Sequence, residues 1–400
     1  MSFVNKPLTD ILDCVRASTA TYVDATGRIR TAGVNQPRID FSSGQGRLLV
    51  EETRTNLITW SEDFSDASWS KVTNFVWEST NIPSPINNVN YMRIKENSAN
   101  GFRQISQDVT INSNQPFSLS FFVKKDVGER FIGVRISNTS WSNRASGVFS
   151  PQTGEFTDRT SLGLATFIGS KSEKQSDGSY RISISGIPDT SGVTTVRVTL
   201  TLTPFDSSSL PNYQGDGVSS LLVTGPQLEQ ASTPSSYIPT QASAVTRAAD
   251  SMSRVLGDEF NPNEFSVYLD FISKAETSQT VYFFDVGRLN NTVNNILLWK
   301  PAGLGIRLQY FADTTQGTSS SNITTPQRVK AVIVFNKANK TAQLFTNGVA
   351  NSVINITTLA LDPTTFRFPY AGSNYNSEIE KVVIYPKALT SSEAIELTRI

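Results

Sequence analysis

The sequence predicts an all-β protein, with an N-terminal segment that holds a short helix and a hairpin, followed by two antiparallel β-sandwiches. Three observations predict this fold class. Apolar and polar residues alternate in many short runs, turn residues separate these runs at intervals of about ten positions, and helical patterns are scarce. The chain has 400 residues, enough for about two to three domains with buried cores.

The first half of the chain contains three runs with the period of a strand. They span residues 117–123, 180–186 and 193–202, and the apolar residues mostly occupy alternate positions, up to the end of the first run. Successive side chains of a strand point to opposite faces of a sheet, so this pattern is typical of strands with one buried face. These runs predict antiparallel sheets.

The second half repeats this pattern with four more predicted strands, at 265–271, 279–286, 305–311 and 327–335. Residues 341–350 predict a hairpin that turns at Asn347–Gly348. An Asn-Gly pair between alternating runs is a strong hairpin signal, because both central residues of a type I′ turn need a positive φ.

Two short helices are predicted near the ends of the chain. Residues 8–16 have an amphipathic pattern, and a hairpin turning at residues 25–28 follows them. At the other end, Thr390 and Glu393 have the spacing of a capping box, in which each side chain bonds to the backbone of the other residue.

Composition divides the chain into four parts. Residues 230–254 are rich in Ser, Thr, Ala and Pro, so we predict a linker at 246–262 between sandwiches at 51–245 and 263–400. Residues 1–50 hold too few strands to be stable alone. They are predicted to form a docking segment that is stabilised on a partner.

The charge and the histidine content exclude several classes of function. The formal net charge is zero, with 35 basic and 35 acidic residues, and histidine is absent. Nucleic acid and anionic membranes are therefore poor candidate partners, and serine triads, cysteine–histidine dyads and histidine metal sites are excluded. The single cysteine, Cys14, forms no internal disulfide and is expected to be a small buried hydrophobe. No apolar run is long enough to insert into a membrane, and the N-terminus lacks the pattern of an export signal.

Several blocks of the sequence resemble a group of tailed-bacteriophage virion proteins. The blocks begin at residues 16–32, 37–41 and 48–57, continue through Trp60, Trp69 and Lys71, and close at residues 225–229, 237–240 and 245–250. This resemblance implies that the sandwich at 51–245 is a jelly roll akin to carbohydrate-binding modules. The segment 263–400 resembles concanavalin A-like, or laminin-G-like, sandwiches.

The resemblance also implies a function. It implies a non-catalytic structural protein on the surface of a phage particle, made in the host cytoplasm and recognising host-surface glycans as a tail fibre or appendage. A capsid decoration or head fibre is the alternative, and a polysaccharide depolymerase is the third hypothesis. The resemblance further implies contacts to other virion proteins through residues 1–50 and a homotrimer.

Carboxylates are the acid–base groups that remain in a chain without histidine. Glu51–Glu52 and Glu62–Asp63 are adjacent pairs, and neighbours on a strand point to opposite faces. The second sandwich adds three more carboxylates, Asp270, Glu378 and Glu380. A glycosidase needs two carboxyls that converge across a cleft, which this spacing does not indicate, so we predict no enzyme activity.

No cofactor is predicted, apart from a structural calcium ion as an open alternative. Residues 206–209 and 212–217 are loops rich in side-chain oxygens, the ligands that calcium prefers. The same residue types are common in ordinary turns, so the metal ligands stay unassigned.

Aromatic residues in polar surroundings are the candidate saccharide-binding groups. A sugar ring offers an apolar face to an aromatic ring, while its hydroxyls seek polar side chains at the edge. Trp141, Tyr213 and Tyr375, with Asn374 and Asn376 beside the last, fit this description. The other four tryptophans lie near apolar strands and are expected in the cores: Trp60, Trp69, Trp77 and Trp299.

Overall fold

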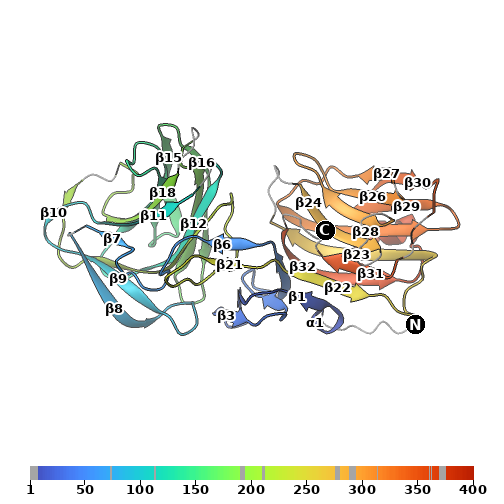
Figure 1. The fold of residues 1–400 in the computed structure, drawn as a ribbon, viewed down its shortest axis with the longest axis horizontal. Coiled ribbons are helices and arrows are strands. Elements are labelled where there is room, and N and C mark those ends of the chain that lie inside the picture. The colour runs from blue at the N-terminus through green and yellow to red at the C-terminus, as the bar shows by residue number, and fades with distance from the viewer. Residues whose placement is uncertain are drawn as a thin grey trace. The chain divides into compact units, whose positions relative to one another are not determined.

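The computed structural model describes residues 8–400 except 73, 112–113, 190–193, 210–211, 275–279, 288–293, 313, 360, 362 and 369–374. The described chain is nearly all-β and forms two compact units (Figure 1). The first sandwich comprises Ala20–Thr31 and Arg54–Arg247. The second sandwich comprises Met1–Thr19, Ala32–Thr53 and Ala248–Ile400. The predicted fold class, all-β with two antiparallel sandwiches, is confirmed.

The first sandwich is built from two six-stranded antiparallel sheets. The strands of one sheet, in spatial order, are β15 (Glu155–Leu162), β14 (Arg144–Ser150), β13 (Phe131–Ser137), β18 (Thr195–Thr203), β11 (Gln104–Thr110) and β7 (Ser70–Lys71). Those of the other are β16 (Thr166–Lys174), β17 (Tyr180–Ile187), β12 (Phe117–Lys125), β20 (Ser220–Glu229), β9 (Asn90–Glu96) and β8 (Phe75–Pro83). The inward residues of both sheets form one hydrophobic core, which includes Ile105, Phe121, Val134 and Leu200.

Three two-stranded pieces complete the first sandwich. They are β2 (Ala20–Val23) with β3 (Ile29–Ala32), β10 (Asn100–Gly101) with β19 (Tyr213–Gln214), and β6 (Arg54–Asn56) with β21 (Val245–Arg247). The hairpin predicted around residues 25–28 is the β2–β3 pair. Its Ile29 packs into a small cluster with Ile86, Tyr91 and Tyr237, so the hairpin is part of this sandwich.

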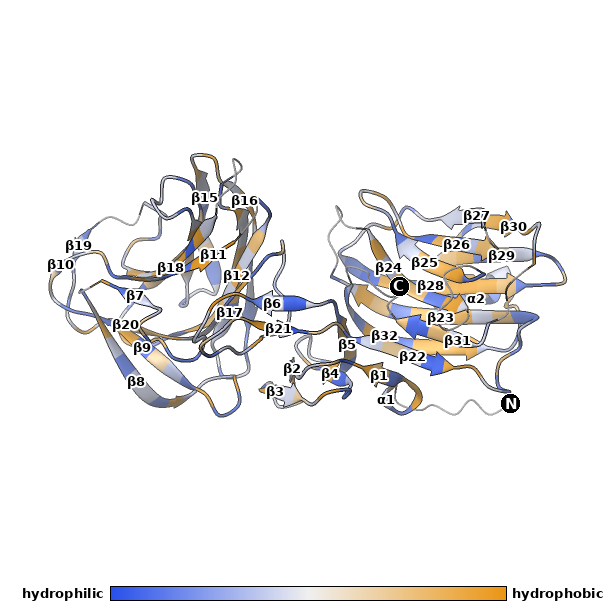
Figure 2. Cartoon of the chain, in the orientation of Figure 1, coloured by the Kyte–Doolittle hydropathy of each residue, from blue (hydrophilic) through white to orange (hydrophobic). Residues whose placement is uncertain are grey.

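The second sandwich has two seven-stranded antiparallel sheets. One contains β1 (Asp13–Val15), β22 (Ser251–Val255), β31 (Thr365–Phe368), β24 (Val281–Gly287), β25 (Ile296–Lys300), β26 (Arg307–Ala312) and β27 (Thr314–Ser320). The other contains β30 (Val349–Asn355), β29 (Thr341–Thr346), β28 (Gln327–Asn336), β23 (Glu264–Ser273), β32 (Asn376–Tyr385), β5 (Arg47–Glu51) and β4 (Arg38–Asp40). Figure 2 shows hydrophobic and hydrophilic residues alternating along strands such as β23.

The helices and one hairpin follow the local signals in the sequence. In α2 (Ser391–Thr398) the capping box of Thr390 and Glu393 is present as predicted, and the helix packs over β28 and β29. The turn at Asn347–Gly348 has positive φ at both residues, 46° and 81°, as predicted. In the part of the chain that the structure describes, no helix is long and apolar enough to cross a membrane.

The structure corrects the predicted domain boundaries. Residues 1–50 do not form a separate docking segment, because β1 pairs with β22, β5 pairs with β32, and the β2–β3 hairpin belongs to the first sandwich. The predicted linker at 246–262 contains β22 and the end of β21. The helix predicted at 8–16 is only α1 (Leu8–Ile11), because Asp13–Val15 instead pairs as a strand with β22, and such tertiary pairing overrides the local helix propensity.

Candidate functional site

The outward side of the sheet that contains β13 carries a row of polar side chains, and we call it the polar face. Because Ile105, Val134 and Val198 point into the core, their strand neighbours point outward. The strand register aligns one outward residue from each of the six strands in a single row: Thr160, Ser146, Arg135, Thr199, Ser106 and Ser70. A row of five hydroxyl side chains and one arginine therefore extends over all six strands of the sheet.

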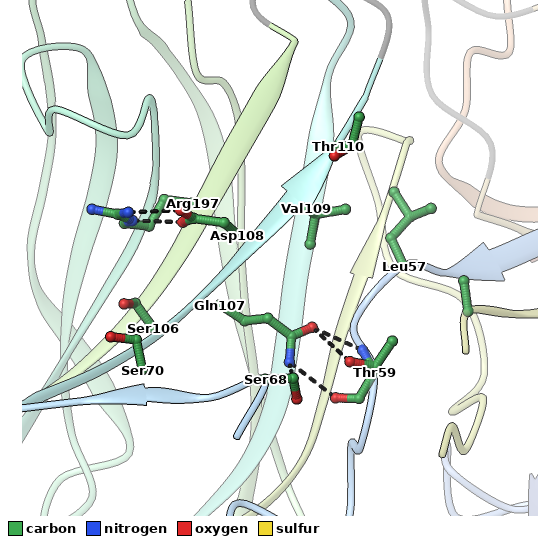
Figure 3. Close-up of a pocket in the computed structure, with 11 residues that line it drawn as sticks. Leu57, Thr59, Ser68, Ser70, Ser106, Gln107, Asp108, Val109, Thr110 and Arg197 are labelled. Atoms are coloured by element: carbon green, nitrogen blue, oxygen red, sulfur yellow. Dashed lines mark hydrogen bonds and ion pairs between the residues drawn. The ribbon is translucent and has the colours of Figure 1, made fainter. Parts of the chain in front are cut away.

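A groove of about 500 Å³ lies at the β11 end of this sheet (Figure 3). In the described register β7 pairs with Ile105 and Ser106, and the next four residues of β11, Gln107–Thr110, line the groove. Its other lining residues are Leu57, Thr59, Ser68, Ser70, Ser106, Arg197 and Ala244. A short strand at the sheet edge thus opens the groove along its longer neighbour.

A bidentate ion pair forms one side of the groove. The Nε of Arg197 donates to Asp108 Oδ1, and its Nη2 donates to Oδ2, each at 2.6 Å. These bonds raise the pKa of Arg197 against the opposing effect of burial. Two residues on facing strands therefore present a fixed, planar arrangement of donors and acceptors.

Gln107 fixes the opposite side. Its side-chain oxygen accepts from Thr59 N at 2.8 Å, and its Nε2 donates to Thr59 O at 3.1 Å and to Ser68 Oγ at 3.3 Å. These bonds, drawn in Figure 3, anchor the segment that carries Leu57 and Thr59 to β11. The groove is therefore held in shape by side-chain hydrogen bonds.

Trp141, the first of the predicted saccharide-binding residues, lies beside this groove. The guanidinium carbon of Arg197 is 4.5 Å from the centre of a Trp141 ring, and Trp141 Nε1 donates to Thr199 Oγ1 at 3.4 Å. The residue is half-buried and has a φ of 56°, a left-handed conformation that is strained for a bulky side chain. The structure thus places Trp141 on the polar face.

Tyr213 and Tyr375 are buried, so the prediction that they are exposed binding residues is wrong. Tyr213 is 8% exposed, its hydroxyl donates to Glu96 Oε2 at 2.7 Å, and the guanidinium of Arg103 stacks on its ring. Tyr375 is 1% exposed and packs edge-on against Phe283 in the core of the second sandwich. Long-range packing buries both rings despite their polar sequence neighbours.

The two asparagines predicted beside Tyr375 are Asn374 and Asn376. Asn374 lies outside the described residues. Asn376 starts β32 and is 8% exposed. The four residues named with Trp141 are therefore not brought together on one surface in the part of the structure that is described.

Two aromatic residues that were not predicted as binding residues lie on the outward side of the second sandwich. Tyr282 and Trp299 stack with ring centres 5.6 Å apart and planes at 13°, and both are half-buried. Trp299 was expected in a core. Its neighbour Leu298 points inward, and the period of two along β25 is the signal that puts Trp299 on the opposite face.

Of the other tryptophans, Trp69 is 2% exposed and lies in the core of the first sandwich, as predicted. Trp60 and Trp77 are partly buried and pack against that core.

The carboxylates weighed for catalysis are held by basic residues. Asp270 accepts from Arg328 at 2.9 Å through both oxygens, and the same arginine lies 2.9 Å from Glu380. Glu378 lies 2.5 Å from Lys274. Glu51 accepts from Arg38 at 2.8 Å. Each of these carboxylates is therefore engaged in an ion pair.

The adjacent pair Glu62–Asp63 has a different environment from the carboxylates that are paired with basic residues. Burial raises the pKa of Glu62, opposed by a hydrogen bond from Tyr237, while Asp63 caps its own turn through Ser65. Among the described residues, the side-chain contact of Glu62 is the hydroxyl of Tyr237 and not a second carboxylate.

The calcium alternative gains no ligand set in the described residues, which contain no group of three or more acidic or cysteine side chains placed to hold a metal. In the loop 212–217, Asp216 accepts from the backbone N–H groups of Val218 and Ser219, and lies 2.9 Å from Arg130. Its carboxylate therefore organises the loop. Cys14 is half-buried, and burial raises the pKa of its thiol.

No model of a protein family matches this sequence, and no curated protein matches it. Among solved structures, the chain is similar to the CBM40 module of the Ruminococcus gnavus IT-sialidase bound to α2,3-sialyllactose, with 14% identity over 35% of this chain and 84% of that one and a TM-score of 0.31. It is also similar to domain 4 of AbnA, a GH43 extracellular arabinanase from Geobacillus stearothermophilus, in complex with arabinotriose. There the identity is 16%, the coverage 42% of this chain and 82% of that one, and the TM-score 0.30.

A third match is the Trypanosoma rangeli sialidase, with 10% identity over 77% of this chain and 60% of that one and a TM-score of 0.30. These TM-scores are low, so the likeness identifies no ligand for this chain. The structural neighbours are carbohydrate-binding modules and sialidase or lectin-like β-sandwich domains.

Proposed function

We propose that the first sandwich is a non-catalytic saccharide-binding module and that its binding site is the groove beside Trp141. The observation that carries the proposal is the preformed Arg197–Asp108 pair, which lines the groove and lies against the tryptophan ring. A pyranose presents hydroxyls that bond to such fixed donors and acceptors, and an apolar face that packs on an aromatic ring.

The other groove residues suit the same ligand. Ser70, Ser106 and Thr110 offer hydroxyls, while Leu57 and Val109 supply apolar surface. A volume of about 500 Å³ is in the range of sites for small molecules. The site therefore combines a few placed polar groups with apolar walls, as small-molecule sites commonly do.

We further propose that the protein is a structural component of a tailed-phage particle, exposed on its surface and acting in host recognition as a tail fibre or appendage. The support is the resemblance of the blocks between residues 16 and 250 to phage virion proteins. The same resemblance supports a homotrimer and synthesis in the host cytoplasm. A capsid decoration is the competing location.

Saccharide binding is tested on an array of immobilised bacterial surface glycans, followed by calorimetry with the best binder. Asp108→Asn breaks the charge-assisted pair and is expected to weaken binding about tenfold. Glu129→Gln is the matched control, because this substitution removes the same charge at a distant site. The side chain of Glu129 is 83% exposed, in the loop between β12 and β13. Equal affinity of the Asp108 variant and the native protein, or no binding to any glycan, overturns the proposal.

The location is tested separately by labelling intact particles with an antibody against this protein and viewing them by electron microscopy. Label on the tail supports the appendage, and label over the head supports the capsid decoration. Particles that carry no label would contradict both. Sedimentation of the purified protein gives its mass and checks the trimer.

Catalysis is tested by incubating the protein with the bound polysaccharide and measuring new reducing ends. The non-catalytic proposal expects none above the level of the untreated polysaccharide.

A further inference from the structure

Two arginines on the polar face have no acidic partner in the described part of the chain. Arg135 on β13 lies opposite Ser146, and Arg144 on β14 lies opposite Ser137, so the two arginines are diagonal neighbours on adjacent strands. Arg197, the other arginine on the described strands of this face, is paired with Asp108. Among the described residues, Arg135 and Arg144 donate hydrogen bonds to backbone carbonyls.

Arg135 is a buried cation. It is 8% exposed, its Nη2 donates to the carbonyl of Ser208 at 2.9 Å, and its Nε has no hydrogen-bond partner among the described residues. Burial, and secondarily the charge of Arg144, lower the pKa of Arg135 to about 10. The side chain therefore stays charged at neutral pH at a cost in desolvation that no carboxylate offsets.

Arg144 connects this cation to the proposed saccharide site. Its Nη1 donates to the carbonyl of Trp141 at 2.9 Å, and its Nε is also buried without a partner among the described groups. The ring of the same tryptophan stacks against Arg197. Trp141 thus contacts Arg144 through its carbonyl and Arg197, which lines the groove, through its ring.

Two hydroxyls on the same face share this unsatisfied state. The Oγ of Ser146 and the Oγ1 of Thr201 are buried without hydrogen-bond partners in the described chain, and the residues are 1% and 3% exposed. Ser146 lies directly opposite Arg135, and Thr201 lies opposite Gly133 on the same strand as Arg135. Buried polar groups normally have partners, so several such donors on one face indicate a ligand.

The acidic side chains of the face are already engaged. Asp108 is held by Arg197, and Asp158 accepts from the backbone N–H of Ser208 at 2.6 Å. Neither neutralises the two arginines. The two arginines therefore have no anion beside them among the described residues of this face.

We infer that Arg135 and Arg144 form a subsite for the anionic group of an acidic saccharide, with Ser146 and Thr201 as further donors. This inference rests on the proposed saccharide site and specifies its ligand class. A carboxylate of a uronic acid and a phosphate of a polyol phosphate share the required chemistry, since both accept the paired N–H groups of guanidinium.

The test measures binding of oligogalacturonate, its carboxyl-reduced neutral counterpart and polyglycerol phosphate by calorimetry. The native protein is expected to prefer at least one anionic probe over the neutral oligomer by about tenfold, in line with the strength of charge-assisted bonds. Which probe binds distinguishes a carboxylate from a phosphate. Arg144→Gln is expected to remove the preference.

Arg159→Gln is the matched control for charge. Arg159 is exposed on β15 and donates to Ser170. It lies opposite Gly147 on β14. The next residue of β14 along from Gly147, Ser146, is on the polar face, so Gly147 and Arg159 are on the opposite face. This variant is expected to keep the preference for the anionic probe.

Arg135→Gln gives an independent readout through thermal unfolding. A buried cation without a partner is expected to be neutral or costly for stability, so the variant should have an unchanged or higher Tm without ligand and should lose the rise in Tm that the anionic probe causes. A lower Tm together with unchanged binding of the probe means a structural role and overturns the inference.

The inference also fails if the native protein binds anionic and neutral oligomers equally, or if Arg144→Gln keeps the preference. Its failure differs from failure of the proposed function. If the neutral oligomer binds and Asp108→Asn weakens that binding, the groove proposal stands although the anionic subsite fails. If no saccharide binds at all, the groove proposal and the anionic subsite are both contradicted.

Discussion

Arg38 and Asp250 form an ion pair whose two side chains are completely buried, although they are 212 positions apart in the sequence. Arg16 joins the same carboxylate at 2.8 Å, and Arg38 also donates to Glu51 at 2.8 Å. Four charged residues from three separate segments thus meet inside the second sandwich. All four belong to the sequence blocks at residues 16–32, 37–41, 48–57 and 245–250, so these blocks include residues with a structural role.

Replacing Asp250 with Asn is expected to destabilise the second sandwich by about 3–5 kcal/mol, because two buried arginines lose their shared anion. Urea unfolding followed by tryptophan fluorescence and circular dichroism measures the change. Asp258→Asn is the control, since Asp258 is exposed in the same unit. A change of less than about 1 kcal/mol, the range of a surface pair, would show that the cluster is dispensable.

Removing residues 1–19 is expected to destabilise the second sandwich and spare the first. The truncation deletes β1 from its sheet and Arg16 from the buried cluster, while the first sandwich keeps all of its segments. Limited proteolysis with mass spectrometry identifies which unit becomes sensitive. Unchanged protection of residues 251–400 would instead support a separable N-terminal segment.

Trp141→Ala is expected to weaken saccharide binding about tenfold while changing the stability by about 1 kcal/mol or less. The ring supports Arg197 as well as a ligand, so both packing and orientation are lost. Calorimetry gives the affinity. Phe102→Ala removes an aromatic ring that is 46% exposed outside the groove, and this control should bind as the native protein does.

Asp126→Asn is expected to lower the free energy of unfolding by about 1 kcal/mol at neutral pH. Burial alone would raise the pKa of Asp126, but bonds from Arg93 and Ser220, both at 2.6 Å, outweigh it and hold the pKa below the ordinary 3.8. The contribution is therefore complete above that ordinary value and is lost as the pH falls through the lower folded-state pKa.

Urea midpoints of the native protein and the Asp126 variant, measured at about pH 7 and about pH 3, should consequently converge in acid. A gap of the same size at both values would mean that the carboxylate charge is not what stabilises this contact.

Patterns of neighbouring residues correctly predicted several strands, one turn and one helix cap. The alternation at 117–123 and 180–186 corresponds to β12 and β17. The Asn347–Gly348 turn and the Thr390 capping box were predicted from adjacent residues and are present. In each case the determinants lie within a few positions of one another.

Partners distant in sequence decided the features that were predicted wrongly. Asp13–Val15 is a strand because Ser251–Val255 lies beside it, and residues 1–50 divide between two units for the same reason. Tyr375 is buried by the packing of Phe283, which no pattern around residue 375 reveals. In the candidate site, Trp141 was identified from its polar neighbours, whereas Asp108, Arg135 and Arg197 become a site only through strand register.

The division of the second sandwich among three segments determines the order in which this protein is able to fold during translation. Strands β1 and β5 leave the ribosome early, but their partners β22 and β32 are made only after the whole of the first sandwich. The nascent chain therefore carries exposed strand edges and an arginine cluster without Asp250 for roughly 200 residues of elongation, at a rate of about 5–20 residues per second. Ribosome-associated chaperones are expected to hold this early segment until the late strands close the sheets.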